Sequence, residues 1–154
     1  MTRFRVVALS LALLALAVFT GLQAHLSAGT VDARTDALAA AKTRVPELLS
    51  YRSGTLDQDF DRALDQTTGS FTDDYRKILT DVVEPTAKRR GISTEASVSA
   101  AGVVSGDRDQ VVVLVFLTQT TTAAGDRSSV SGSRVEVTLQ RSGDDWKIAG
   151  LKPV

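Results

Sequence analysis

Apolar positions follow two different periods along the chain, a helical one in the first half and a strand-like one in the second. From Thr30 to Ser50 the apolar residues recur at i, i+3 and i+4, which predicts an amphipathic helix. Pro46 lies inside this pattern, and proline lacks the backbone N–H that a helix interior uses. We therefore expect the helix to kink or end near Val45.

The stretch from Gly54 to Gly69 predicts a second, shorter helix. Thr55, with Gln58 three residues later, fits a capping box, in which a hydroxyl caps the start of a helix. The apolar residues of the stretch then recur at helical spacing: Leu56, Phe60, Ala63 and Leu64. Gly69 supplies the left-handed residue that ends such a helix.

The same stretch holds three alternating acids, Asp57, Asp59 and Asp61, like the first half of an EF-hand calcium loop. Such a loop needs Gly at its sixth position and a bidentate Glu at its twelfth. This chain has Arg62 and Thr68 at those two positions. We therefore interpret the acids as the first turn and solvated outer face of a helix, where they suit the positive end of the helix dipole.

A third helix is predicted from Phe71 to about Arg90. Acidic residues lie in its first turn and basic residues in its last turn, and both placements match the helix dipole. Pro85 predicts a kink or a restart after Glu84, because the residue before a proline is disfavoured in helical conformation. Gly91 is the expected C-cap of this helix.

The second half of the chain predicts four strands joined by short turns. The first runs from Glu95 to Val104, where Gly102 indicates a bulge. Gln110–Thr121 holds the continuous apolar run VVVLVFL, which predicts a central strand covered on both faces. Ser133–Arg141 alternates cleanly, and Trp146–Leu151 follows after a hairpin turn. Helices followed by antiparallel strands indicate an α+β fold, with three helices packed on one face of a curved, mostly antiparallel four-stranded sheet.

An uncharged apolar run of 17 residues, Val6–Leu22, follows Arg3 and Arg5. The alternatives are a cleaved signal peptide and an uncleaved anchor. The run exceeds the usual signal-peptide core of about 7–15 residues, and the residues after it offer a poor A-x-A-like cleavage site. We favour a signal anchor whose arginines stay in the cytoplasm. This predicts a cytoplasmic N-terminus at residues 1–5, a transmembrane anchor at residues 6–24 and an exported domain at residues 30–154.

Composition excludes several classes of function. Formal net charge is zero and the charges are mixed along the chain, whereas a nucleic-acid binder would show a basic stripe. The chain has no Cys and one His, which excludes disulfides, thiolate metal sites, Cys nucleophiles, His-rich metal sites and most acid–base relays. We expect no cofactor and no metal.

The residues expected to face the helices from the sheet are all apolar, whereas a catalytic group there should be titratable. The tyrosines, Tyr51 and Tyr75, are expected to pack in the core. We therefore expect no enzymatic activity. The same inward residues would line an apolar cavity if side chains do not fill it: Val103, Val113, Val115, Leu117, Val135, Val137, Leu139, Trp146 and Ile148.

The stretch ALAAAKTRVPELLSYRSGTLDQDFDRALDQTTGSFTDDY resembles the signature region of the Mce-associated membrane proteins. The matching pieces are Ala37-Leu38, Ala40-Ala41, Leu49-Ser50-Tyr51, Thr55-Leu56-Asp57, Asp59-Phe60 and Thr68-Gly69-Ser70-Phe71. The ending VEVTLQRSGDDWKIAGLKPV is similar to the close of that family, with Trp146, Leu151 and Pro153-Val154. The layout of one anchor, three helices and a four-stranded meander also resembles the NTF2-like group and the VirB8-type scaffold of type IV secretion.

The resemblance implies a transmembrane helix followed by an NTF2-like domain, in a non-catalytic accessory or scaffold protein. Such a protein would stabilise an Mce-type lipid transport complex in the cell envelope, with Mce subunits as partners and no catalytic residues to carry over. The alternative is a lipid- or sterol-binding module that uses the apolar cavity. Either way, we expect a single-pass protein of the cytoplasmic membrane with an extracytoplasmic C-terminal domain and no nucleic-acid partner.

Overall fold

The computed structural model describes residues 29–125 and 128–154. The predicted N-terminus at residues 1–5 and anchor at residues 6–24 lie outside these ranges. Among the described helices, none is both long enough and apolar enough to cross a membrane. A boundary after Asp32 divides the chain into two compact units, Met1–Asp32 and Ala33–Val154. The fold described below is that of the second unit.

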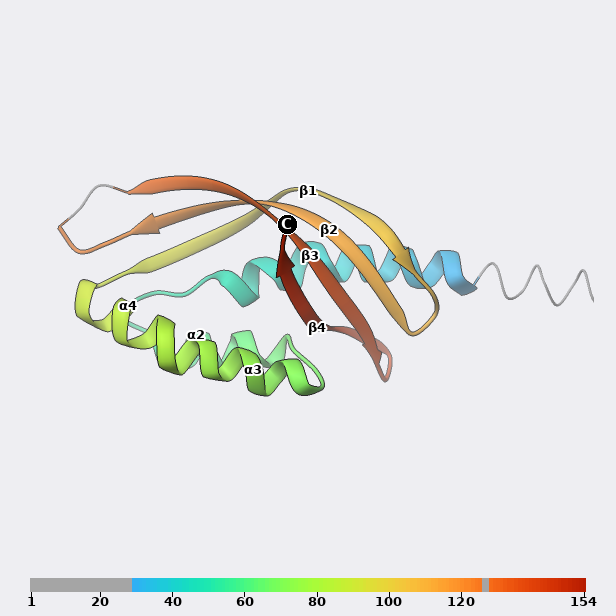
Figure 1. The fold of residues 1–154 in the computed structure, drawn as a ribbon, viewed down its shortest axis with the longest axis horizontal. Coiled ribbons are helices and arrows are strands. Elements are labelled where there is room, and N and C mark those ends of the chain that lie inside the picture. Colours follow the sequence, from blue (N-terminus) through green and yellow to red (C-terminus); the bar gives the residue numbers. More distant parts are fainter. Residues whose placement is uncertain (1–28, 126–127) are drawn as a thin grey trace, which may run out of the picture. The chain divides into compact units, whose positions relative to one another are not determined.

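The helices follow the predicted order (Figure 1). The first ends at residue 49, and α2 (Leu56–Asp65), α3 (Ser70–Ile78) and α4 (Glu84–Arg90) follow it. A π-helical segment, Leu79–Val83, joins α3 directly to α4. The α-helical hydrogen-bond pattern therefore restarts at Glu84, beside Pro85, as the sequence predicted.

Of the two alternatives expected near Val45, a kink or an end, the end is wrong, because the helix continues through Pro46 to residue 49. Val45 and Leu48 are almost completely buried, at 0% and 2% exposure. The hydroxyl of Tyr75 on α3 also donates a hydrogen bond of 2.7 Å to the carbonyl oxygen of Leu48. These contacts hold the turn after the proline in helical conformation although one backbone donor is missing.

Both predicted caps of α2 are wrong. Thr55 precedes the helix but makes no side-chain capping bond, because its hydroxyl donates to the Asp59 carboxylate at 2.8 Å instead. The helix ends at the right-handed residue Gln66. Gly69 has the expected positive φ, 64°, but it precedes α3 rather than ending α2. Gly91 is confirmed as the left-handed C-cap of α4, with φ 59° and ψ 41°.

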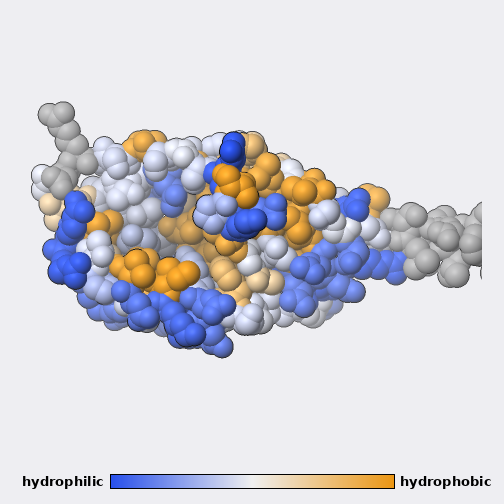
Figure 2. Space-filling model, viewed as in Figure 1, coloured by the Kyte–Doolittle hydropathy of each residue, from blue (hydrophilic) through white to orange (hydrophobic). Residues whose placement is uncertain are grey.

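The four strands form one antiparallel meander in the order β1-β2-β3-β4. Their bounds are Ser93–Gly106 for β1, Gln110–Thr122 for β2, Ser129–Ser142 for β3 and Asp145–Pro153 for β4. Figure 1 shows the curved sheet with the helices gathered on one of its faces. Seen from the same side in Figure 2, apolar patches lie over the right half of the sheet and on the helical layer, and hydrophilic side chains follow the lower, outer side of the helices.

Two predictions about the strands are wrong. Gly102 is not the bulge, because the register between β1 and β2 shifts on either side of it, at Ser99 and at Val104. The apolar run of β2 is not covered on both faces, since its residues alternate between buried and more exposed positions and Phe116 is 42% exposed. A continuous apolar run therefore overstated the covering, because all the helices pack on the same face.

The second helix is tied to both edges of the sheet. Before α2, Tyr51 forms an antiparallel bridge with Thr94 of β1, and after α2, Thr67 forms a parallel bridge with Ile148 of β4. The inner face of the sheet and the helices bury one continuous apolar core. The loops around α2 are thus fixed at opposite edges, and the segment before α2 forms the site described next.

Candidate functional site

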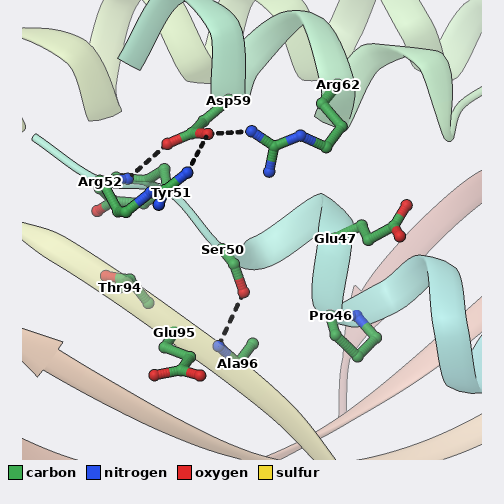
Figure 3. Close-up of a pocket in the computed structure, with 10 residues that line it drawn as sticks. All are labelled: Pro46, Glu47, Ser50, Tyr51, Arg52, Asp59, Arg62, Thr94, Glu95 and Ala96. Atoms are coloured by element: carbon green, nitrogen blue, oxygen red, sulfur yellow. Dashed lines mark hydrogen bonds and ion pairs between the residues drawn. The ribbon is translucent and has the colours of Figure 1, made fainter. Parts of the chain in front are cut away.

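A pocket of about 450 Å³ lies between the end of the first helix, the start of α2 and strand β1 (Figure 3). This volume falls within the range of about 300–1,000 Å³ that small-molecule sites occupy. Its lining combines apolar and charged side chains: Pro46, Glu47, Ser50, Tyr51, Arg52, Asp59, Arg62, Thr94, Glu95 and Ala96.

Asp59 organises one wall of this pocket. Its side chain is 1% exposed, and its Oδ2 accepts hydrogen bonds of 2.8 Å from the backbone N–H of Arg52 and from the Thr55 hydroxyl. The guanidinium of Arg62 donates to Oδ1 from one helical turn away. The Arg52 guanidinium lies 3.7 Å from the same oxygen. One buried carboxylate therefore fixes both the backbone before α2 and the arginines at the pocket wall.

The pKa of Asp59 is set by opposing effects. Burial raises it by disfavouring the charged carboxylate, but the hydrogen bonds from Arg52, Thr55 and Arg62, together with the Arg62 charge, outweigh burial. The pKa therefore lies below the ordinary value of an aspartate, and the group is ionised at neutral pH.

Short polar contacts join the opposite wall to β1. The backbone N–H of Tyr51 donates to the Thr94 carbonyl at 2.9 Å, and the Thr94 N–H donates back at 2.8 Å. The N–H of Ala96 donates to the Ser50 hydroxyl oxygen at 2.9 Å. The ring of Tyr51 meets Phe60 edge to face, with centroids 6.2 Å apart. The pocket is thus a preformed feature of the fold rather than a gap between mobile loops.

The mouth of the pocket carries two carboxylates. Glu47 reaches it from the first helix and Glu95 from β1, and Figure 3 shows the two groups on opposite sides of the pocket. In the part of the chain that the structure describes, neither has a hydrogen-bond or ion-pair partner. These carboxylates and the exposed guanidinium of Arg52 are the lining charges best placed to meet a polar group from outside.

The nine residues predicted to line a cavity lie on the inner face of the sheet, and eight of them are buried in the core. The exception, Val103, is partly buried. None of the nine lines the pocket beside Asp59. The indole N–H of Trp146 is buried with no hydrogen-bond partner among the described residues, and the guanidinium of Arg141 lies 4.7 Å from the centre of its ring. A hollow cone over these residues stays a prediction.

The two tyrosines pack as expected. Tyr75 is buried in the core, where burial first and then the nearby Tyr51 raise the pKa of its hydroxyl well above the ordinary range. The hydroxyl keeps its proton and bonds to Leu48. Tyr51 is half-buried between α2 and β1.

The three alternating acids do not share one role. Asp57 and Asp61 are exposed, as predicted, and Asp57 lies 4.0 Å from the ammonium of Lys88. Asp59 contradicts the prediction of a solvated residue, because it is buried at the pocket wall. A signal for this was present in the sequence: Asp59 falls on the same helical face as Leu56 and Ala63, within the apolar stripe.

Comparison with solved structures defines the class of fold. The IcmL-like type IV secretion system protein of Legionella pneumophila superposes with a TM-score of 0.68 at 8% identity, over 79% of this chain and 91% of that one. CagV of Helicobacter pylori, a VirB8 homolog, superposes with a TM-score of 0.60 at 12% identity, over 76% and 95% of the two chains. The domain therefore has the VirB8-like, NTF2-like α+β fold.

Sequence comparison then gives the family. The family model described as uncharacterized protein Rv1363c/MT1408-like matches residues 3–154. Outer membrane protein Rv1973 of Mycobacterium tuberculosis is 38% identical over 122 residues, which are 79% of this chain and 76% of that protein. The chain belongs to the Rv1363c/MT1408-like family.

Proposed function

We propose that this chain is a non-catalytic accessory protein of the cell envelope, held by a single membrane anchor, which stabilises an Mce-type lipid transport complex. The observation that carries the envelope role is the fold, which the chain shares with CagV, a component of a type IV secretion system. The name of the relative Rv1973, an outer membrane protein, also supports a place in the envelope.

The finer parts of the proposal rest on the sequence. The order and spacing of the motifs between residues 37 and 75 and at the C-terminus support the Mce complex as the partner. The apolar run Val6–Leu22 behind two arginines supports the anchor. The apolar character of the nine inward residues supports a role without turnover, because a catalytic site needs convergent polar groups.

The test is cross-linking of the full-length protein in membranes, followed by affinity purification and identification of partners by mass spectrometry. We expect Mce transporter subunits to be recovered with the protein. Recovery of type IV secretion components instead would contradict the Mce assignment while leaving the accessory role in place. Recovery of the protein alone would contradict both.

A second experiment addresses the anchor. A truncated chain beginning at Thr30 should fold, because the described core lies after that residue. The same chain should not restore lipid transport in a deletion strain, whereas the full-length chain should. Full restoration by the truncated chain would show that an anchored scaffold is the wrong description.

The second candidate function is a lipid- or sterol-binding module, and the indole N–H of Trp146 favours it. A buried donor without an acceptor loses free energy unless something supplies one, and a lipid carbonyl in the cone would do so. The chain has one Trp, so its fluorescence reports on this position alone. Titration with short-chain phosphatidylglycerol below its critical micelle concentration should shift the emission saturably, and Val115→Phe should remove the shift by filling the cone. An unchanged spectrum would count against a carrier.

A further inference from the structure

Strand β1 lies at one edge of the sheet, and among the described residues its backbone accepts or donates hydrogen bonds on the open side at its two ends. At the start, Tyr51 and Ser50 take the backbone groups of Thr94 and Ala96. At the end, the guanidinium of Arg34 donates two hydrogen bonds, of 2.8 and 3.1 Å, to the carbonyl oxygen of Gly106. The stretch between these contacts pairs with no other strand of the described chain.

The register identifies which residues aim their backbone groups at the open edge. Thr94 bonds to Tyr51 through both its N–H and its C=O, so it faces away from β2. In an antiparallel pair, successive residues face alternately toward and away from the neighbour. Each extra residue in β1, Ser99 and Val104, shifts this alternation by one position. After Thr94, the outward-facing residues are Ala96, Val98, Ala101, Val103 and Gly106.

The last four of these residues are spaced symmetrically. Val98 and Ala101 are three residues apart, Ala101 and Val103 are two apart, and Val103 and Gly106 are three apart, because the bulges lie on either side of the central pair. A regular strand offers backbone groups every second residue, so it cannot match this spacing over its length. A second β1 running antiparallel, with the symmetry axis at Gly102, places Ala101 opposite Val103 and Val98 opposite Gly106, whose carbonyl oxygen already accepts from Arg34.

Among the described residues, neither backbone conformation nor a close contact requires a glycine at that axis. Its φ is not positive, so the position does not need the conformational freedom of glycine. A Cβ built there would meet no atom within 4 Å. Glycine inside a strand costs stability, and a close approach by another backbone is one of the reasons for which strands retain it.

The open stretch also lacks two of the features that commonly protect an edge, charge and proline. Exposed edges are commonly blunted by charged residues, proline or bulges, and residues 97–106, SVSAAGVVSG, contain no charge and no proline. The two bulges, at Ser99 and Val104, are still present. When two β1 edges pair about Gly102, each bulge lies opposite a residue next to the other copy's bulge. The absence of charge matters here, because a two-fold axis brings like charges face to face.

We propose that the β1 edge pairs with the β1 edge of a second copy of this chain, antiparallel and with Gly102 at the two-fold axis. Ala101 of each copy exchanges hydrogen bonds with Val103 of the other, as in any hydrogen-bonded antiparallel pair. The two Gly102 residues form the central non-hydrogen-bonded pair, with Cα atoms about 4.5 Å apart. The sheets of the two copies then form one continuous sheet across the paired β1 strands.

A groove beside the edge has room for side chains of the second copy. Lys42 and Pro46 of the first helix form one side of it, and residues 96–101 of β1 form the other, enclosing about 620 Å³. The β1 side of the groove consists of small residues apart from Val98. A second strand can therefore approach the edge without displacing the first helix.

Cysteine cross-linking of the full-length protein tests this proposal, since the natural chain has no cysteine. Gly102→Cys places the new thiols of two copies within the Cα separation of about 4.4–6.8 Å that a disulfide requires. Gly132→Cys on β3 is the matched control, because it lies on another strand and its Cβ meets only an ordinary contact at 3.9 Å. Oxidation in membranes should convert most of the first variant, and little of the second, to a covalent dimer. Equal yields, or a cross-link to another protein, would overturn the proposal.

Charge substitution at the same position provides an independent measurement. Gly102→Lys and Gly102→Asp should each be monomeric in detergent by light scattering, because like charges meet at the axis. Mixing the two variants should restore a dimer, which a folding defect would not do. Gly132→Lys should behave as the natural chain. A natural chain that is monomeric, or a mixture that stays monomeric, would rule out pairing at Gly102.

Discussion

At the scale of single residues, Asp59 combines nearly complete burial with a charge, and its surroundings explain why this is tolerated. A buried carboxylate is costly unless donors surround it, and here a backbone N–H, a hydroxyl and a guanidinium supply them. The group therefore couples the segment before α2 to the helix itself, and the pocket wall depends on it.

Replacing Asp59 by Ala should lower the free energy of unfolding by about 3 kcal/mol, because a buried network loses the partner that its donors share. Asp59→Asn should cost less, since the amide oxygen still accepts a hydrogen bond. Asp61→Ala is the control, because this neighbouring acid is exposed and surface substitutions usually change stability by less than about 0.5 kcal/mol. Urea unfolding followed by circular dichroism measures all three. Equal losses for Asp59→Ala and Asp61→Ala would mean that the Asp59 contacts contribute nothing.

The lowered pKa of Asp59 also predicts how stability depends on pH. The folded-state pKa lies below the unfolded value of about 3.9. The stabilisation is therefore present above pH 4 and is lost as the pH falls through the folded-state pKa. Asp145, whose pKa the hydrogen bond from Arg44 lowers, adds to the same trend. Unfolding free energies between pH 6 and pH 2.5 should fall more steeply for the natural chain than for Asp59→Asn. If the two proteins lose stability in parallel as the pH falls, the pKa of Asp59 is the same in the folded and unfolded states.

At the scale of elements, periodicity predicted the type and order of the helices and strands, because each buries one face against the same core, while the predicted third helix is divided into α3, a π-helical segment and α4. It missed features that depend on neighbours. Only the fold shows that Tyr75 supports the turn after Pro46, or that β2 has a single covered face. The pocket was missed because its other walls come from the first helix and β1, although the position of Asp59 within the apolar stripe of α2 was visible in the sequence.

The end of α4 gives a prediction at this scale. Gly91 has φ 59°, and a Cβ there would lie 2.8 Å from the Cβ of Ala124. Gly91→Ala should therefore cost about 1–3 kcal/mol of stability through backbone strain and the clash. Gly54→Ala is the control, since that glycine lacks a positive φ and has open space around it. Thermal unfolding of the two variants should show a lower Tm for the first alone. If both variants melt like the natural chain, the left-handed cap is not needed.

At the scale of the whole molecule, the arrangement separates two kinds of surface. The helices cover one face of the sheet and bury the apolar core, while the long β1 edge and the outer face of β2 stay accessible. Function in a scaffold depends on such accessible surfaces rather than on the core. The pocket beside Asp59 and the groove beside the β1 edge share Pro46 and Ala96 in their linings, so a partner or a second copy in the groove would also meet the pocket.

Two β-bridges flank α2, Tyr51–Thr94 before the helix and Thr67–Ile148 after it. They predict that the helices and the sheet unfold cooperatively. Because the helix is tied to both edge strands, helices and sheet should lose structure in one transition, as small single domains usually do. The chain beginning at Thr30 carries one reporter for each layer: far-UV circular dichroism for the helices and the fluorescence of Trp146 for β4. The two signals should have the same urea midpoint in this chain. In Asp59→Ala, which weakens the attachment of α2 to β1 through Tyr51, both midpoints should shift to lower urea concentration together. A helical signal that disappears while Trp146 remains buried would show instead that the helices dock weakly on an independently stable sheet.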